Sequence, residues 1–298
     1  MSAAHAWAVA LRPRSLPVAV SPVLIGAALG WLRTGAIDLV AALLVLGAAL
    51  LMQLITNLQN DVGYTLRGGE RLGTRTGLPR ATAQGLLSVG EVRVAIVAAA
   101  LLATGLGLAL VALRGWPVLA IGVASLLAAL AYMGGPRPIA YTPFGELTVF
   151  VFFGLVAVAG TDWVLTQDVG LPTVLAAAAN GGIAASALAV NNHRDRAHDA
   201  QVGRSTFAVR FGPGASRVLH ALLLLGPFAL VPVLVWAAET RALLLLLLLA
   251  PAAWRLQRDF AHCAPGLAYN AILFRTFKLQ MGFGVLLAVG AVGGKLEW

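Results

Sequence analysis

Repeated apolar runs, each about as long as a membrane-crossing helix, constrain this chain more than any other feature. Of its 298 residues, 59% are hydrophobic and 11% are charged, whereas a typical soluble domain carries about 25% charged residues. About 20 apolar residues suffice for one crossing of the hydrocarbon layer. The sequence therefore predicts an all-α membrane protein that forms a single domain over residues 1–298.

The apolar runs predict nine membrane spans. They cover residues 15–33, 37–58, 92–113, 116–133, 146–163, 171–191, 216–238, 241–254 and 272–293. The eighth is the shortest and depends on the leucine run at 243–249. The first follows Arg12 and Arg14 as a signal peptide would, but the many later spans favour a retained transmembrane helix.

The basic residues predict the orientation. With the N-terminus in the cytoplasm, 17 of the 21 Lys and Arg residues fall in cytoplasmic segments, as the positive-inside rule requires. The four that fall outside are Arg33, Arg114, Arg241 and Lys295. We therefore expect a multi-pass protein of a bacterial-type cytoplasmic (inner) membrane, in contact with lipid. Its net charge of +9 follows from topology and predicts no nucleic-acid partner.

Two long cytoplasmic loops are expected, at about 59–91 and 192–215, and long loops in compact proteins are usually functional. The first begins around Asn57, Asn60 and Asp61, which share one helical face at the end of an apolar span. The second begins with a similar run of amide and acidic residues, 191–195. The similarity predicts two related helical units whose polar ends face one cavity.

Asp195 and Asp199 lie four residues apart, so a continuous helix places both carboxylates on one face. Their repulsion calls for a cation. Mg²⁺ is one candidate, because carboxylate oxygens suit it. The alternative is local pairing with arginine, and the nearby guanidinium groups are those of Arg194, Arg196 and Arg204.

Arginines are abundant around these acids. Those of the two loops include Arg67, Arg71, Arg75, Arg80, Arg204 and Arg210. One guanidinium group can donate two parallel hydrogen bonds to phosphate oxygens. Arginines next to acids that hold Mg²⁺ therefore predict a pocket for a diphosphate, and the apolar spans predict a hydrophobic chamber beneath it. An isoprenyl diphosphate fits that description, and its ionisation would expose an allylic cation to an electron-rich ring. The alternative is that these arginines only anchor lipid headgroups and set topology.

Three segments of the chain resemble the UbiA superfamily of intramembrane aromatic prenyltransferases. They are 57–61 with 75–80, 132–147, and 191–212. The middle segment is the most similar to the branch that acts on 1,4-dihydroxy-2-naphthoate. The resemblance implies about nine transmembrane helices around a central cavity. It also implies transfer of a polyprenyl group from polyprenyl diphosphate to the naphthoate ring, giving demethylmenaquinone, diphosphate and CO₂.

The motifs and the resemblance together define a set of expected site residues. Mg²⁺ would be held by Asn60, Asp61, Asp195 and Asp199. The catalytic set would be Asp61, Asp195, Asp199 and Tyr141. The substrates would be bound by Asn57, Arg75, Arg80, Arg137, Asn192, Arg204 and Lys278.

Tyr64 departs from the family pattern, which has a second aspartate four residues after Asn60. A neutral phenol is a poor ligand for Mg²⁺, although Asp61 is retained and Glu70 falls where naphthoate-type members carry a further acid. Two alternatives follow: a prenyltransferase for another phenol, such as homogentisate or 4-hydroxybenzoate, or a transporter or non-catalytic isoprenoid-binding protein. Glu146, which opens the fifth span, either favours a helix N-terminus or contributes to acceptor binding.

Overall fold

The computed structural model describes residues 2–69 and 76–296, in which the regular elements are all helical. In chain order they are α1 (Ala3–Leu11), η1 (Pro13–Ser15), α2 (Pro17–Thr34), α3 (Leu39–Leu66), α4 (Val89–Arg114), α5 (Trp116–Met133), η2 (Ile139–Tyr141), α6 (Gly145–Val149), η3 (Phe150–Val156), α7 (Ala157–Thr166), α8 (Leu171–Arg194), α9 (Arg196–Gln201), α10 (Phe207–Ala229), α11 (Val231–Ala238), η4 (Arg241–Leu249), α12 (Ala250–His262) and α13 (Tyr269–Leu296). The expected all-helical architecture is confirmed.

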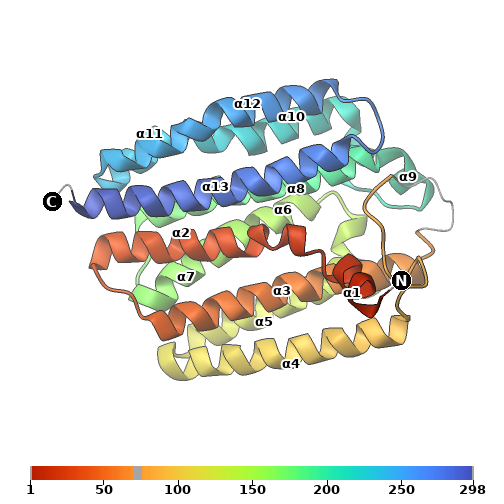
Figure 1. Ribbon diagram of the computed structural model, residues 1–298, viewed down its shortest axis with the longest axis horizontal. Helices are drawn as coiled ribbons and strands as arrows, with labels where there is room; N and C mark the ends of the chain where they lie inside the picture. Colours follow the sequence, from red (N-terminus) through yellow and green to blue (C-terminus); the bar gives the residue numbers. More distant parts are fainter. Residues whose placement is uncertain (1, 70–75, 297–298) are drawn as a thin grey trace.

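Eight helices in the described ranges are long and apolar enough to cross a membrane, and they match eight of the nine predicted spans. The predicted span at 241–254 does not meet that criterion, because it begins as the 3-10 helix η4 and continues into the polar helix α12. Figure 1 nevertheless shows this segment running back beside α10 and α11, and it places the two chain termini at opposite ends of the bundle. Termini at opposite ends require an odd number of passages.

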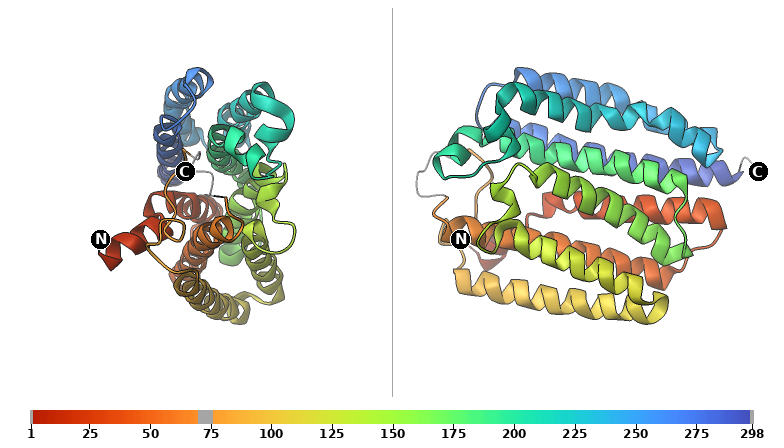
Figure 2. Two further views of the ribbon diagram at one scale, coloured as in Figure 1. Left: turned by 90° about the vertical axis from the view of Figure 1, so that its right-hand side faces the viewer. Right: turned by 180° about the vertical axis from the view of Figure 1, so that it is seen from behind.

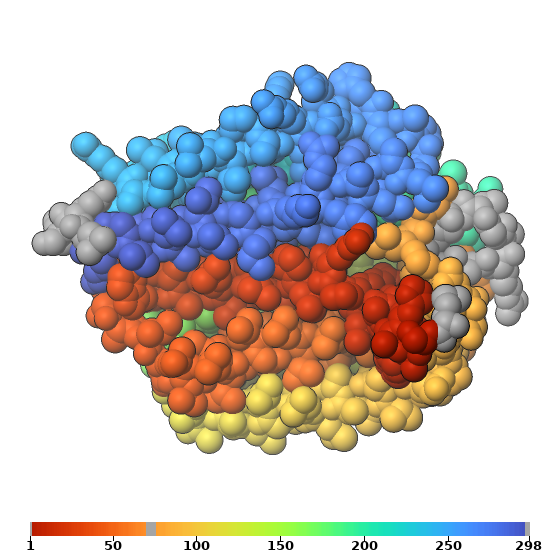
Figure 3. All heavy atoms as spheres, in the orientation of Figure 1, coloured from red at the N-terminus to blue at the C-terminus, as the bar shows by residue number. Residues whose placement is uncertain are grey.

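The helices lie side by side with nearly parallel axes, and α8 occupies the centre of the bundle (Figure 2). It packs against α2, α10, α13 and the π-helix η3. The space-filling view shows the face that α2, α3 and α13 form together (Figure 3). A Cβ atom on Gly154 would lie 2.6 Å from the Cα atom of Gly181, so η3 and α8 touch backbone to backbone. Small residues permit this approach, which drives helix association in lipid.

Capping residues set where the helices begin and end. Asp38 starts α3 by accepting a hydrogen bond from the backbone N–H of Ala41 at 3.0 Å. Ser88 and Glu91 form a reciprocal capping box at the start of α4. Gly35, with φ of +73°, ends α2 in the left-handed conformation that glycine tolerates.

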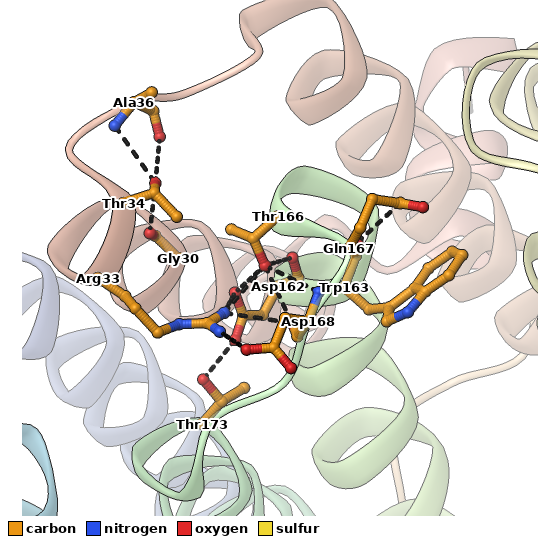
Figure 4. A network of polar contacts seen from close by, with 10 residues as sticks. All are labelled: Gly30, Arg33, Thr34, Ala36, Asp162, Trp163, Thr166, Gln167, Asp168 and Thr173. Atoms are coloured by element: carbon orange, nitrogen blue, oxygen red, sulfur yellow. Dashed lines mark hydrogen bonds and ion pairs between the residues drawn. The ribbon is translucent and has the colours of Figure 1, made fainter.

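A polar network ties α2, α7 and α8 together at the end of the bundle where α2 and α7 terminate (Figure 4). Arg33 donates to Asp162 at 2.8 Å and also pairs with the exposed Asp168. Thr173 donates to the other oxygen of Asp162 at 2.6 Å. Asp162 is fully buried, so these partners satisfy its charge.

A second polar contact lies at the same end. Arg114, at the C-terminus of α4, pairs with Asp38 and donates to the backbone carbonyl of Val164. The hydrogen bond from Ala41 and the contact with Arg114 hold the pKa of Asp38 below its usual value. Two of the four basic residues predicted outside, Arg33 and Arg114, therefore form ion pairs at this end of the bundle.

Candidate functional site

The two polar segments that were expected to begin loops lie largely on helices. Helix α3 continues to Leu66, past the expected loop start at 59, and α8 reaches Arg194 before α9 begins. The backbone N–H of Asp199 bonds to the carbonyl of Asp195 at 2.8 Å, so the helical turn continues across the junction. The helices persist because their polar faces meet a cavity and each other rather than lipid.

A cavity of about 840 Å³ extends through the bundle from these helix ends. Asn60 of α3 and Asp195 at the end of α8 both line it, as the two similar segments predicted. Most of the remaining lining is apolar and comes from α2, α3, α4, α5, η3, α7, α8 and α13. One end of the cavity is therefore polar and charged, whereas its body suits a hydrocarbon chain.

Tyr64 lies buried between the two polar segments. Its hydroxyl donates to Asp199 at 3.2 Å, and Arg204 donates both to that hydroxyl and, at 2.7 Å, to Asp199. The guanidinium carbon of Arg80 lies 3.6 Å from the centre of the Tyr64 ring, within cation–π range. Tyr64 thus joins both aspartate segments at the position where the family pattern has an acid.

Each aspartate of the second segment pairs with a nearby arginine. Asp195, which is 5% exposed, receives two hydrogen bonds of 2.8 Å from the guanidinium of Arg194. Asp199 pairs with Arg204. The structure therefore confirms that the two aspartates pair with nearby arginines. The two guanidinium groups also offset the repulsion between the carboxylates.

Asp61 does not line the cavity. Its fully buried carboxylate accepts hydrogen bonds from the backbone N–H of Ala81 at 2.9 Å and of Thr82 at 2.8 Å. The sequence predicted that Asp61 faces a metal, whereas its carboxylate faces the turn at Ala81 and Thr82. The buried N–H groups of that turn need an acceptor, and Asp61 provides it. Asp61 anchors the segment that carries Arg80, and its catalytic and metal roles stay predictions.

Four of the residues expected to bind substrate, Asn57, Arg80, Asn192 and Arg204, line the cavity. Asn57 donates to the carbonyl of Leu11 at 2.9 Å, which fastens the end of α1 to α3. Arg75 and Glu70 lie outside the described residues.

Asp199 is fully buried and, like three other expected residues, is not part of the cavity lining. Arg137 and Lys278 are exposed and line neither end of it. Lys278 follows Phe277, which does line the cavity, so it points to a different side of α13. The guanidinium carbon of Arg67 lies 5.2 Å from the centre of the Tyr141 ring. Burial raises the pKa of the Tyr141 phenol, so the phenol stays protonated at neutral pH.

Two contacts were missed in the sequence. Tyr64 was expected only as a lost ligand, although its position four residues after Asn60 places it on the same helical face and could have revealed the contact. The amide of Asn192 also donates to Glu146 at 2.9 Å. No pattern in the sequence links those two positions.

Three oxygen donors fit Mg²⁺, two of them carboxylates from the α8–α9 side and one an amide from α3. Within the described ranges, no three His, Cys, Asp and Glu side chains group closely enough to hold a metal by themselves. Asn60 adds an amide oxygen to the carboxylates of Asp195 and Asp199, and such oxygens suit Mg²⁺. Asn60 is the candidate ligand from α3, because the carboxylate of Asp61 is already engaged by backbone N–H groups and Tyr64 is neutral.

Comparison with known proteins places this geometry in a family. The model of the UbiA prenyltransferase family matches residues 19–277. The chain is 36% identical over 233 residues to a 1,4-dihydroxy-2-naphthoate octaprenyltransferase from Escherichia coli, covering 76% of this chain and 75% of that protein. It is also 36% identical over 219 residues to the enzyme of the same name from Mycobacterium tuberculosis, covering 73% and 74%.

Solved structures share the fold. A UbiA homologue from Archaeoglobus fulgidus bound to GPP and Mg²⁺ matches with a TM-score of 0.68 at 18% identity, covering 98% of both chains. The apo structure of a UbiA homologue from Aeropyrum pernix K1 matches with a TM-score of 0.68 at 16% identity, covering 95% of this chain and 98% of that one. The family match, the two relatives and the shared fold lead to one conclusion: this chain belongs to the UbiA prenyltransferase family.

Proposed function

We propose that this protein transfers a polyprenyl group from polyprenyl diphosphate to 1,4-dihydroxy-2-naphthoate, releasing diphosphate and CO₂ and giving demethylmenaquinone. One observation carries the proposal: a single cavity joins a charged end to an apolar body. The apolar body suits the prenyl chain, and the charged end suits the diphosphate. The names of the relatives from Escherichia coli and Mycobacterium tuberculosis support the naphthoate as acceptor.

Arg80 and Arg204 would bind the diphosphate. Both guanidinium groups line the cavity and both lie against the ring of Tyr64, at 3.6 and 5.0 Å from its centre. Guanidinium groups that are already oriented lose little freedom when they bind phosphate oxygens. They would stabilise the negative charge that grows on the diphosphate as its bond to the prenyl carbon breaks.

Asn60, Asp195 and Asp199 would hold Mg²⁺, which, when bound, neutralises charge on the leaving diphosphate. Arg194 and Arg204 pair with the two carboxylates and orient them. Because Tyr64 stands where the family pattern has an acid, most of the negative charge available to the metal comes from the α8–α9 side.

Aromatic side chains would protect the reacting carbon. Phe152 and Phe153 of η3 line the cavity together with Phe274 and Phe277 of α13. Aromatic faces attract cations, and the apolar lining excludes the water that would otherwise capture the allylic cation. We place the charged end at the cytoplasmic side, since 17 of 21 basic residues are predicted there.

A membrane assay with radiolabelled polyprenyl diphosphate, Mg²⁺ and separate ring acceptors tests the proposal. We expect labelled lipid product with 1,4-dihydroxy-2-naphthoate and release of its carboxyl group as CO₂. If labelled product forms only with homogentisate or 4-hydroxybenzoate, that compound and not the naphthoate is the acceptor. No transfer to any of the three would support a transport or non-catalytic protein instead.

A further inference from the structure

A second cavity, here called the side recess, lies between the start of the fifth span and α10. Its volume is about 480 Å³, and none of its lining residues belongs to the first cavity. Four phenylalanines form much of its wall: Phe144, Phe150, Phe207 and Phe211. Phe144 and Phe211 are 60% and 53% exposed, so the side recess is accessible from outside the bundle.

Glu146 is one of two charged residues in the side recess. It is only 5% exposed, and its Oε1 accepts a hydrogen bond from Asn192 at 2.9 Å. Its Oε2 is buried and receives no hydrogen bond from any described residue. A buried acceptor without a donor costs stability, so its retention needs an explanation. Because Oε2 is itself covered, the Glu146 side chain would have to rotate toward the side recess, and the hydroxyl group of a ligand there would then supply the missing donor.

Arg210 is the other charged residue of the side recess, and it is exposed. Its guanidinium lies 5.8 Å from the centre of the Phe211 ring. No acidic side chain within residues 2–69 or 76–296 pairs with it. An unpaired guanidinium beside an apolar recess is complementary to a carboxylate.

We propose that the side recess binds the ring acceptor, a flat hydroxy-aromatic acid, before it reaches the first cavity. The ring packs against the phenylalanines, a ring hydroxyl donates to Oε2 of Glu146, and the carboxylate pairs with Arg210. This assignment rests on the proposed function, which makes such a compound the substrate. A lipid acyl chain would satisfy neither Glu146 nor Arg210.

Asn192 connects the side recess to the site of reaction. Its amide donates to Glu146, which lines the side recess, while Asn192 itself lines the first cavity. A Cβ atom on Gly145 would lie 3.7 Å from the hydroxyl of Tyr132, another residue of the first cavity. The partition between the two cavities is therefore one layer of side chains, and an acceptor held by Glu146 lies next to it.

Filling the side recess tests the proposal. Leu219 lines the recess, whereas its neighbour Val218 does not and is 59% exposed. We expect Leu219→Trp to weaken binding of 1-hydroxy-2-naphthoate about tenfold, and the matched control Val218→Trp to bind it like the wild type. Isothermal titration calorimetry of protein in lipid nanodiscs, with empty nanodiscs subtracted, measures this. Equal binding by the two variants would overturn the proposal.

Arg210→Gln gives a second test that does not depend on repacking, because Arg210 is exposed. The wild type should prefer 1-hydroxy-2-naphthoate over 1-naphthol, which lacks the carboxylate, and the variant should lose about tenfold of that preference. The KM for the prenyl diphosphate should not change. An unaltered preference in Arg210→Gln would contradict the role of Arg210.

Failure of the proposed function gives a different result. In that case the wild type would prenylate no ring acceptor, yet the probe would still bind in a manner sensitive to Leu219→Trp. If the wild type prenylates the naphthoate while Leu219→Trp changes neither probe binding nor the acceptor KM, only the side recess assignment is lost.

Discussion

The hydroxyl of Tyr64 donates a hydrogen bond of 3.2 Å to Oδ1 of Asp199 and so joins the end of α3 to α9. The same hydroxyl accepts from Arg204, which also pairs with Asp199. A phenol and an arginine therefore hold together two segments whose acids would repel each other if the family pattern were kept. The metal requirement of this protein should depend on that difference.

Tyr64→Asp should strengthen Mg²⁺ binding. A carboxylate at this position would lie near Asp199 and add a hard oxygen ligand with a negative charge. We expect the Mg²⁺ concentration for half-maximal prenyl transfer to fall about tenfold. Titration of the membrane assay with Mg²⁺ measures it. Tyr64→Phe is the matched control, because it keeps the ring beneath Arg80 and removes only the hydroxyl. Tyr64→Asp with the wild-type Mg²⁺ requirement would show that position 64 is not a metal position.

Asp195→Asn should abolish transfer by the molecules that fold, and loss of the buried pair with Arg194 should also lower the Tm. The substitution preserves shape but removes a charge that we assign to Mg²⁺ binding, and several kcal/mol of charge stabilisation correspond to a loss of at least about hundredfold. Asp259→Asn is the control, since Asp259 is 37% exposed and pairs with Arg275 at the surface. Turnover of both variants, normalised to folded protein, tests this. Full activity of Asp195→Asn would remove Asp195 from the site.

Asp61→Ala should act on stability more than on metal binding. It leaves the buried N–H groups of Ala81 and Thr82 without their acceptor, at a cost of about 2 kcal/mol. We expect a lower Tm and faster proteolysis in the 80–88 segment, with an unchanged Mg²⁺ concentration for half-maximal activity. A raised Mg²⁺ requirement at wild-type Tm would instead support a direct metal role for Asp61.

Asp162→Asn should destabilise the bundle without changing turnover per folded molecule. Its buried carboxylate pairs with Arg33, whose side chain is 30% exposed, so the loss should be about 1–3 kcal/mol, less than for a fully buried pair. Asp168→Asn removes a partner of the same arginine that is 74% exposed, and it should cost less than about 1 kcal/mol. Thermal unfolding followed by tryptophan fluorescence compares the two. Equal Tm shifts would contradict the importance of burial.

The sequence was sufficient to predict eight of the nine spans and the meeting of the two polar segments. Apolar runs of membrane-crossing length fix helices, and similar polar patterns at the ends of α3 and α8 placed Asn60 and Asp195 on one cavity. The eighth span differed because its leucine run continues into a helix with Arg255 and Arg258, so length and composition alone do not define it.

Other features depend on contacts between distant parts of the chain. The engagement of Asp61 by Ala81 and Thr82 depends on how a later turn folds back. The exposure of Lys278 depends on the rotation of α13 against its neighbours. The side recess arises only where the start of the fifth span packs near α10. Local periodicity carries no information on such packing.

The polar contacts of Arg33 and Arg114 lie at the end of the bundle that the first cavity approaches from the inside. The cavity reaches Val164, whose carbonyl accepts a hydrogen bond from Arg114 far from Asp195. Arginine–aspartate pairs on α2, α4, α7 and the N-cap of α3 therefore surround the deep end of the chamber without lining it. We expect the tail of a bound amphiphile to meet apolar side chains along its whole length, because the charges at that end are already engaged with each other.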